Sequence, residues 1–139
     1  MISARANRRA KHRGAVTVEF ALVIGLFFMF LIASIEFARF NIVRHVVDNA
    51  AYEAARKAIV PGATAGDATD TANAYLATIG TQGATVIVDP DPIEDVTEEV
   101  SVTVNVPMDQ NTWVVPIFTG GATVSATSTL RCERYRGIE

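Results

Sequence analysis

The residue types with the clearest chemical potential lie where a long apolar stretch begins, with Gly14 and Ala15 just before the single acid Glu19. A carboxylate at the entrance of a membrane-length apolar helix is costly, and such groups usually have a function. Cleavage of the Gly14–Ala15 bond would create an α-ammonium at a helix N-terminus, which already carries the positive end of the helix dipole. Glu19 would lie about 6 Å further along the helix axis. It could therefore offset the new charge or pair with the amine of a neighbouring subunit.

The segment before this site is short and basic. Residues 1–13 hold five Arg or Lys and no acid, a charge of +5, which leaves −8 on the rest because the whole chain is −3. A basic run could bind nucleic acid, but directly before an apolar stretch it is typical of a cytoplasmic end that sets membrane orientation. The sequence therefore predicts a basic leader over residues 1–14, with its N-terminus in the cytoplasm.

A transmembrane helix is predicted over residues 15–35, where Glu19 is the only charged residue. This length matches the roughly 20 residues that cross a bilayer. A removable signal peptide is disfavoured, because no pair of small residues at the required spacing follows the apolar run. No cysteine follows it that could accept a lipid. The apolar helix is therefore expected to be retained, with the residues after it outside the cytoplasm.

The helix is expected to continue through residues 36–60, which contain no Gly or Pro, and to end at Pro61-Gly62. Together with the span it would be roughly 70 Å long. Glu36 and Arg39 mark the far boundary of the span. Apolar residues three or four apart predict one buried face, formed by Phe40, Val43, Val47, Ala50 or Ala51, Ala54 and Ala58. The polar residues are expected on a solvated face, and these are Arg39, Arg44, His45, Asp48, Glu53 and Arg56.

Residues 61–139 are predicted to form a small extracytoplasmic α+β domain. A short helix is expected near 67–79, with Asp67 capping its start and Gly80 at its end. After this helix, apolar and polar residues alternate with a period of two residues, which indicates strands near 84–88, 96–106 and 124–130. Polar alternates on these strands favour an antiparallel sheet with one buried face, on which the long helix packs.

The apolar segment 111–121, with Trp113 and Phe118, is too short to span a membrane. Its composition suits packing on the core, the preferred interpretation, or contact with the membrane surface. Cys132 is the only cysteine, so no disulfide within the chain is possible.

No catalytic or cofactor motif is visible, and His12 and His45 lie on opposite sides of the predicted membrane span. No enzymatic activity, cofactor, bound metal, nucleic acid or small-molecule substrate is therefore expected. One acidic stretch offers oxygen ligands that calcium favours, but its prolines and missing turn glycine favour a solvated hairpin instead: Asp89, Asp91, Glu94, Asp95, Glu98 and Glu99.

Gly14, Glu19 and Phe20, followed by an apolar helix, resemble the processing site of type IV prepilins and pseudopilins. The longer string over residues 13–40, RGAVTVEFALVIGLFFMFLIASIEFARF, resembles the N-terminal region of TadE-like proteins. These are minor pilins or pseudopilins of the tight-adherence (Tad) pilus system. At the other end, ATVSATSTLRCE over residues 122–133 resembles the closing strand of that family.

The resemblance implies that a prepilin peptidase cuts after Gly14 and that Ala15 becomes the first mature residue, where related pilins are N-methylated. It implies that Glu19, the fifth mature residue, is the acid used in assembly, with Phe20 in the following aromatic position. The implied partners are the membrane, the peptidase, other Tad pilins or pseudopilins, and inner-membrane platform proteins. The implied location is a bacterial inner membrane, crossed once, with the C-terminal domain periplasmic or extracellular.

The segment of about eighty residues beyond the helix indicates a minor component, since the major Tad pilin is very short. The Glu19–Phe20 pair and the chain length favour TadE over its sister TadF. Two alternatives from the same residues are a pseudopilin of a type II secretion system and a signal-anchored extracytoplasmic binding module without a filament.

Overall fold

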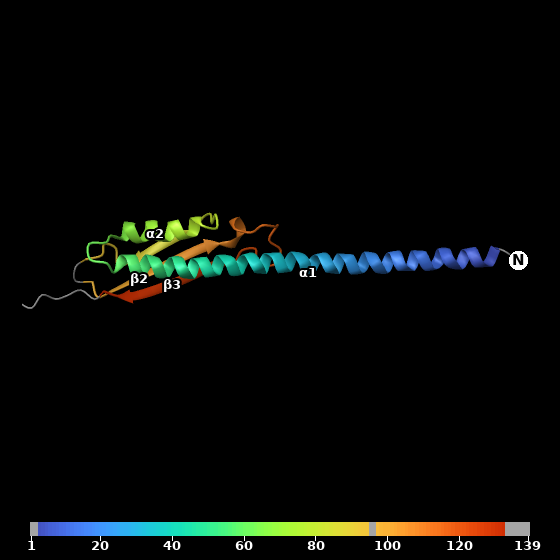
Figure 1. Cartoon of the computed structure of the whole chain (residues 1–139), viewed down its shortest axis with the longest axis horizontal. Coiled ribbons are helices and arrows are strands. Elements are labelled where there is room, and N and C mark those ends of the chain that lie inside the picture. The colour runs from blue at the N-terminus through green and yellow to red at the C-terminus, as the bar shows by residue number, and fades with distance from the viewer. Residues whose placement is uncertain (1–2, 95–96, 133–139) are drawn as a thin grey trace, which may run out of the picture. The chain divides into compact units, whose positions relative to one another are not determined.

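The computed structural model describes residues 3–94 and 97–132. The elements follow one another as shown in Figure 1: α1 (Ser3–Ala58), α2 (Ala65–Ala77), β1 (Thr85–Asp89), β2 (Glu99–Pro107), the 3₁₀ helix η1 (Met108–Gln110) and β3 (Thr123–Arg131). The chain divides into two compact units, Met1–Ile35 and Glu36–Glu139. A long apolar N-terminal helix, a second short helix and a three-stranded antiparallel sheet confirm the predicted α+β class.

The described residues of the first unit all belong to α1. The helix from Gly14 to Ala58 contains an 18-residue window with a mean hydropathy of 2.5, and none of that window is buried. Within the described residues it is the one helix long and apolar enough to cross a membrane. The large apolar side chains of this stretch are exposed: Val16, Val18, Phe20, Leu22, Val23, Leu26, Phe27, Phe28, Met29, Phe30 and Leu31.

In the second unit, the remainder of α1 buries the face that the periodicity predicted. Phe40 is partly buried, and the fully buried positions are Val43, Val47, Ala50, Ala51, Ala54, Ala55 and Ala58. The helix ends at Ala58, just before Pro61, and Gly62 adopts a φ of 81°, which favours glycine. Both the buried face and the stop at Pro61-Gly62 are therefore confirmed.

The helix α2 begins earlier than predicted, at Ala65, and its N-cap is Thr64 rather than Asp67. Asp67 lies in the first turn instead, where its carboxylate accepts the Thr64 N–H at 2.9 Å while the Thr64 hydroxyl accepts the Asp67 N–H at 3.2 Å. This reciprocal capping box satisfies two backbone donors and fixes the start of the helix. At the other end, Gly80 has a φ of 66° and its N–H donates to the Ala77 carbonyl, as expected of a glycine that ends a helix.

The sheet has the order β1-β2-β3 and is antiparallel throughout. Val104 of β2 faces Val86 of β1 on one side and Ala126 of β3 on the other. The outer face carries hydroxyl pairs across β2 and β3, with Thr103 Oγ1 and Thr127 Oγ1 at 2.8 Å. The predicted alternation of buried apolar and exposed polar residues along the strands is therefore confirmed.

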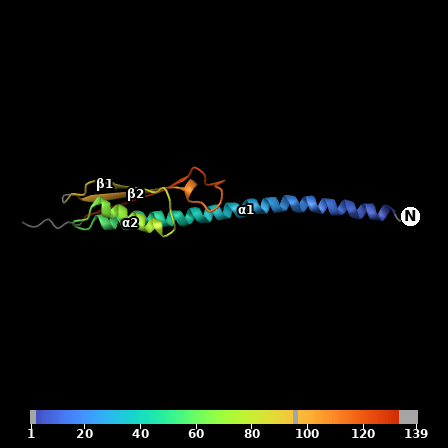
Figure 2. The same ribbon diagram turned by 90° about the horizontal axis from the view of Figure 1, so that it is seen from above.

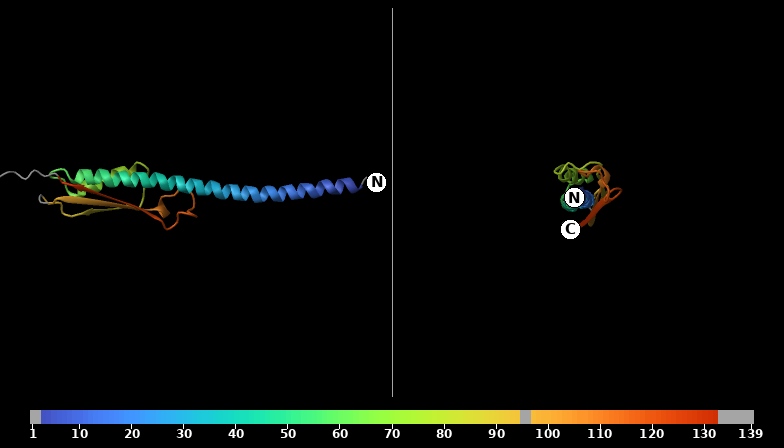
Figure 3. Two further views of the ribbon diagram at one scale, coloured as in Figure 1. Left: turned by 90° about the horizontal axis from the view of Figure 1, so that it is seen from below. Right: turned by 90° about the vertical axis from the view of Figure 1, so that its right-hand side faces the viewer.

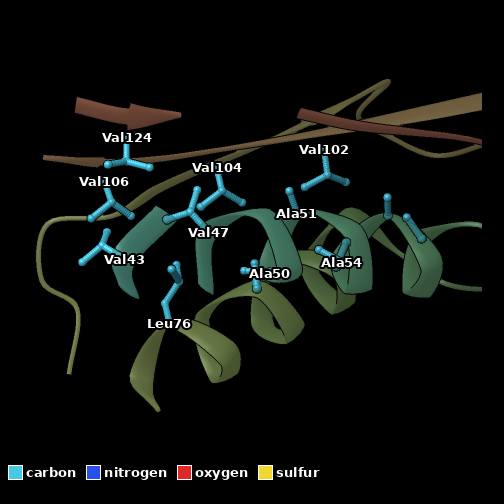
Figure 4. Close-up of a cluster of buried hydrophobic side chains, with 14 of the residues drawn as sticks. Val43, Val47, Ala50, Ala51, Ala54, Leu76, Val102, Val104, Val106 and Val124 are labelled. Carbon is cyan, nitrogen blue, oxygen red and sulfur yellow. The ribbon is translucent and has the colours of Figure 1, made fainter. Parts of the chain in front are cut away.

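The core of the second unit lies between the two helices and the inner face of the sheet. Figures 2 and 3 show both helices on one face of the strands. In Figure 4, Val47 and Ala51 of α1 point toward Val102 and Val104 of β2, while Leu76 of α2 extends toward the opposite side of α1. Small alanine side chains allow the elements around α1 to approach closely, because interaxial distance depends on side-chain size at the contact.

Candidate functional site

The predicted processing residues lie on successive turns of α1 in the first unit. Gly14, Ala15, Glu19 and Phe20 are all exposed, and a Cβ added at Gly14 would meet nothing within 4 Å. Ala15 and Glu19 are four residues apart, a spacing that places both on one face of a helix. The structure therefore presents the Gly14–Ala15 bond and the Glu19 carboxylate on the same side of α1.

The Glu19 carboxylate stands on a surface that is otherwise apolar. Among the side chains that the structure describes, none forms an ion pair with Glu19. A carboxylate exposed among Val16, Val18 and Phe20 is poorly placed in lipid unless another group neutralises it. The local chemistry thus leaves Glu19 available to a cation supplied by another molecule.

A second candidate site is centred on Glu36. The sequence alone indicated this residue only as the far boundary of the membrane span. Its side chain is completely buried. Glu36 Oε1 accepts the backbone N–H of Ile117 at 2.9 Å, and Oε2 accepts the N–H groups of Phe118 at 2.9 Å and Thr119 at 3.0 Å. The Thr119 hydroxyl donates to Oε2 at 3.2 Å. One carboxylate therefore anchors a tight turn of the loop that precedes β3.

Opposing effects set the pKa of Glu36. Burial raises the pKa, because it removes the carboxylate from water, but hydrogen bonds from Ile117, Phe118 and Thr119 stabilise the charged form. The hydrogen bonds outweigh burial, and the pKa lies below its ordinary value. Glu36 is therefore ionised at neutral pH and holds the loop as an anion.

Arg39, one turn further along α1, is also buried, so its predicted place on a solvated face was wrong. Its Nε donates to the Asn111 carbonyl at 2.8 Å and its Nη2 to the Ile79 carbonyl at 3.1 Å. Its guanidinium carbon lies 5.1 Å from the centroid of the Trp113 ring, within the range of a cation–π contact. Arg39 thus joins α1, the segment just after α2 and the start of the same loop.

The residues from Asn111 to Ala122 are here called the apolar loop. Its largest apolar side chains do not pack on the core as predicted for residues 111–121, although Ala122 at its end does. Trp113, Val115, Ile117 and Phe118 remain 62%, 79%, 64% and 48% exposed. The loop is nevertheless held firmly at its base. The Asn111 side-chain amide donates to the Gln82 and Pro107 carbonyls, and its oxygen accepts the Gln82 N–H. The loop therefore presents its apolar side chains outward on an ordered backbone.

Periodicity offered a means of finding Glu36 and Arg39 that the sequence interpretation did not use. Glu36 precedes Val43 by seven residues and Val47 by eleven, and Arg39 precedes Val43 by four. Extending the apolar face of α1 backward by this spacing places both charges on the buried face. The backbone groups that satisfy them lie 40 to 83 positions away and follow no local pattern.

The described residues contain no group of three or more His, Cys, Asp or Glu side chains placed to hold a metal ion. Asp95, one member of the acidic stretch, lies outside the described residues.

Cys132 follows β3 as a free, half-buried thiol, and its N–H donates to the Glu98 carbonyl at 2.8 Å.

Comparison with known families identifies the N-terminal part of the chain. The model of the family described as TadE-like protein matches residues 14–56. This match confirms the resemblance over that range and is consistent with a TadE-like protein of the Tad pilus system. The C-terminal segment 122–133 lies beyond the match, and Glu133 lies outside the described residues. No curated protein and no solved structure matches the chain.

Proposed function

With a TadE-like segment over residues 14–56 as the premise, we propose that this chain is a minor pilin or pseudopilin of a Tad-type pilus. It takes part in assembly of the pilus for surface adherence or secretion, after cleavage between Gly14 and Ala15. The observation that most directly supports this function is that the family match begins at Gly14, where an exposed apolar stretch of α1 with one acid also begins. The proposed role is assembly rather than catalysis.

In this role the chain has four parts. Residues 1–14 are the leader, 15–35 the transmembrane helix, 36–60 its amphipathic continuation and 61–139 the extracytoplasmic domain. The basic leader holds the N-terminus in the cytoplasm of a bacterial cell, and the apolar helix keeps the chain in the inner membrane. A prepilin peptidase removes the leader, and the mature chain then joins other Tad pilins and the inner-membrane platform.

Access to the scissile bond is supported by the surroundings of Gly14. No described side chain lies near the position of an added Cβ. Glycine in a helix interior costs about 1 kcal/mol relative to alanine, which favours local opening of α1 at this bond. A bulky side chain here would both fill the open space and strengthen the helix.

Glu19 acts after cleavage in this mechanism. The freed ammonium of Ala15 lies on the same helix face, and a charge pair in a low-dielectric medium is much stronger than in water. Pairing of Glu19 with the ammonium of a neighbouring subunit would set the register of one helix against the next. Phe20 extends the apolar surface beside this pair and is 64% exposed.

Mass spectrometry of the mature N-terminus in the native host tests the proposal. The wild-type chain is expected to begin at Ala15, whereas Gly14→Leu is expected to begin at Met1 and to migrate more slowly. Gly25→Leu is the matched control, because Gly25 lies in the same helix and an added Cβ there also meets nothing within 4 Å. A wild-type chain that begins at Met1, or beyond Ile35, would contradict the proposal.

A further inference from the structure

The apolar loop exposes large side chains without any charge among them. Residues 111–122 read NTWVVPIFTGGA and contain no Asp, Glu, Lys or Arg. Trp113, Val115 and Ile117 are each more than 60% exposed, so they cover no part of the core. Several large apolar side chains exposed on one loop are typical of a surface that binds another molecule or a membrane.

In the middle of the loop, at residues 116–119, the backbone donors are satisfied within the protein. The N–H groups of Ile117, Phe118 and Thr119 all donate to the Glu36 carboxylate, and Pro116 has no N–H. Four consecutive positions therefore need no water to satisfy a backbone donor. Backbone donors that enter a membrane must be satisfied internally, because each unsatisfied group costs several kcal/mol there.

The loop is attached to the residue that follows the proposed membrane span in the sequence. Glu36 directly follows Ile35, the last residue of the span, and consecutive Cα atoms are about 3.8 Å apart. The loop is thus bound to the first residue after the span. Arg39 holds Asn111 and contacts the ring of Trp113 one turn later. Tryptophan is enriched at membrane–water interfaces, where its ring lies at headgroup level.

From these observations we infer that the apolar loop inserts Trp113, Val115, Ile117 and Phe118 into the phospholipid interface where the span ends. The occupant of this surface is the bilayer, because the loop is bound to Glu36, the residue that directly follows the span in the sequence. The inference rests on the membrane anchoring in the proposed function, but not on leader cleavage or pilus assembly. It gives the second unit a contact with the membrane in addition to the covalent link through α1.

Trp113 is the only tryptophan of the chain, so intrinsic fluorescence of the full-length protein reports on this loop alone. The full chain is reconstituted in phosphatidylcholine vesicles, with and without lipids that carry bromine near the headgroup. The matched control is the double variant W113F/I87W. Ile87 lies on the outer face of β1 and is 52% exposed, close to the 62% of Trp113. Because the two positions are similarly exposed in the protein alone, a difference in quenching between wild type and the control variant reports contact with the bilayer.

The expected result is that brominated lipid quenches Trp113 and that aqueous iodide quenches it several-fold less than the tryptophan of the control variant. This protection should persist as the protein is diluted in lipid. Equal iodide quenching of both proteins, in vesicles that carry them through a flotation gradient, would overturn the inference and leave the anchor intact. Protection that disappears on dilution would overturn it in favour of a second copy covering the loop. Failure to float would overturn both the anchor and the inference, whereas a failure of leader processing would leave every readout unchanged.

Discussion

Glu36 and Thr119 lie 83 positions apart in the sequence and are joined by two hydrogen bonds to one carboxylate oxygen. The Thr119 N–H donates to Glu36 Oε2 at 3.0 Å and the Thr119 hydroxyl donates to it at 3.2 Å. Both residues are buried. The contact fastens the loop before β3 to the residue that follows the proposed membrane span, so the stability of the second unit depends on a charge at its edge.

Replacement of Glu36 by Gln should destabilise the second unit. The amide nitrogen of glutamine cannot accept a hydrogen bond, so part of the set of buried N–H donors from Ile117 to Thr119 would be left unsatisfied. The midpoint of urea unfolding, followed by Trp113 fluorescence of the full chain in detergent, is expected to fall. Glu53→Gln is the control, because within the described part of the chain the half-buried Glu53 forms a 3.6 Å ion pair with the exposed Arg56. Equal midpoints for the two variants would show that the buried carboxylate contributes no stability.

Stability should also depend on pH through Glu36. Its pKa in the folded protein lies below the ordinary value, since hydrogen bonds outweigh burial. A lowered pKa contributes stability that is fully present above the unfolded value, about 4.3 for Glu, and that is lost as the pH falls through the folded value. The free energy of unfolding should therefore decrease below about pH 4.3 in the wild type and less steeply in Glu36→Gln. Asp67, whose pKa is lowered by its hydrogen bonds to Thr64, contributes in the same direction, so Asp67→Asn is a second comparison. Parallel pH profiles for wild type and Glu36→Gln would contradict this assignment.

Enlargement of an alanine on the buried face of α1 should disturb the core. Ala54 is completely buried, and Figure 4 shows it among the packed side chains of the second unit. Ala54→Leu is expected to lower the free energy of unfolding by about 1–3 kcal/mol, as overpacking of a filled core does. Asn49→Leu introduces the same side chain at an exposed position of the same helix and should change stability by no more than about 0.5 kcal/mol. Urea titration of both variants makes the comparison, and similar losses would argue against close packing around Ala54.

Neutralisation of Glu19 should separate processing from assembly. In Glu19→Gln the chain is expected to be cleaved normally and to begin at Ala15, because the scissile bond is unchanged. Assembly should fall sharply, since a neutral amide cannot offset the ammonium of a neighbouring chain. Glu19→Asp keeps the charge and should retain more function. Pilus recovery from the native host, together with N-terminal mass spectrometry, checks both parts, and normal pili from Glu19→Gln would remove the proposed role of Glu19.

Local patterns were enough to predict most of the elements. The spacing of Val43, Val47 and Ala54 predicted the buried face of α1, because helical periodicity depends only on neighbouring residues. The alternation of valines from Val100 to Val106 predicted the buried face of β2 for the same reason. Pro61-Gly62 marked the helix end, since proline cannot continue a helix and Gly62 adopts a positive φ.

Local patterns failed where a partner distant in the sequence decides the outcome. The Asp67 error is different, because it is local: Thr64, three residues earlier, is the N-cap, and Asp67 completes the capping box from within the helix. Arg39 looks like a surface charge, yet two carbonyls and a tryptophan ring surround it. The apolar loop looks like core, but the space beneath the sheet is already filled by α1 and α2.

The sequence by itself determined that an apolar stretch of membrane length follows a basic segment, with Gly14 at the junction and Glu19 within the apolar stretch. These features need no folding, because length, charge and spacing along one helix define them. Only the tertiary structure decided which groups meet Glu36 and Arg39 on the buried face, and that these contacts hold the apolar loop outward. The reason is physical: buried charges are tolerated only where hydrogen-bonding groups converge on them, and here those groups arrive from segments that folding alone brings together.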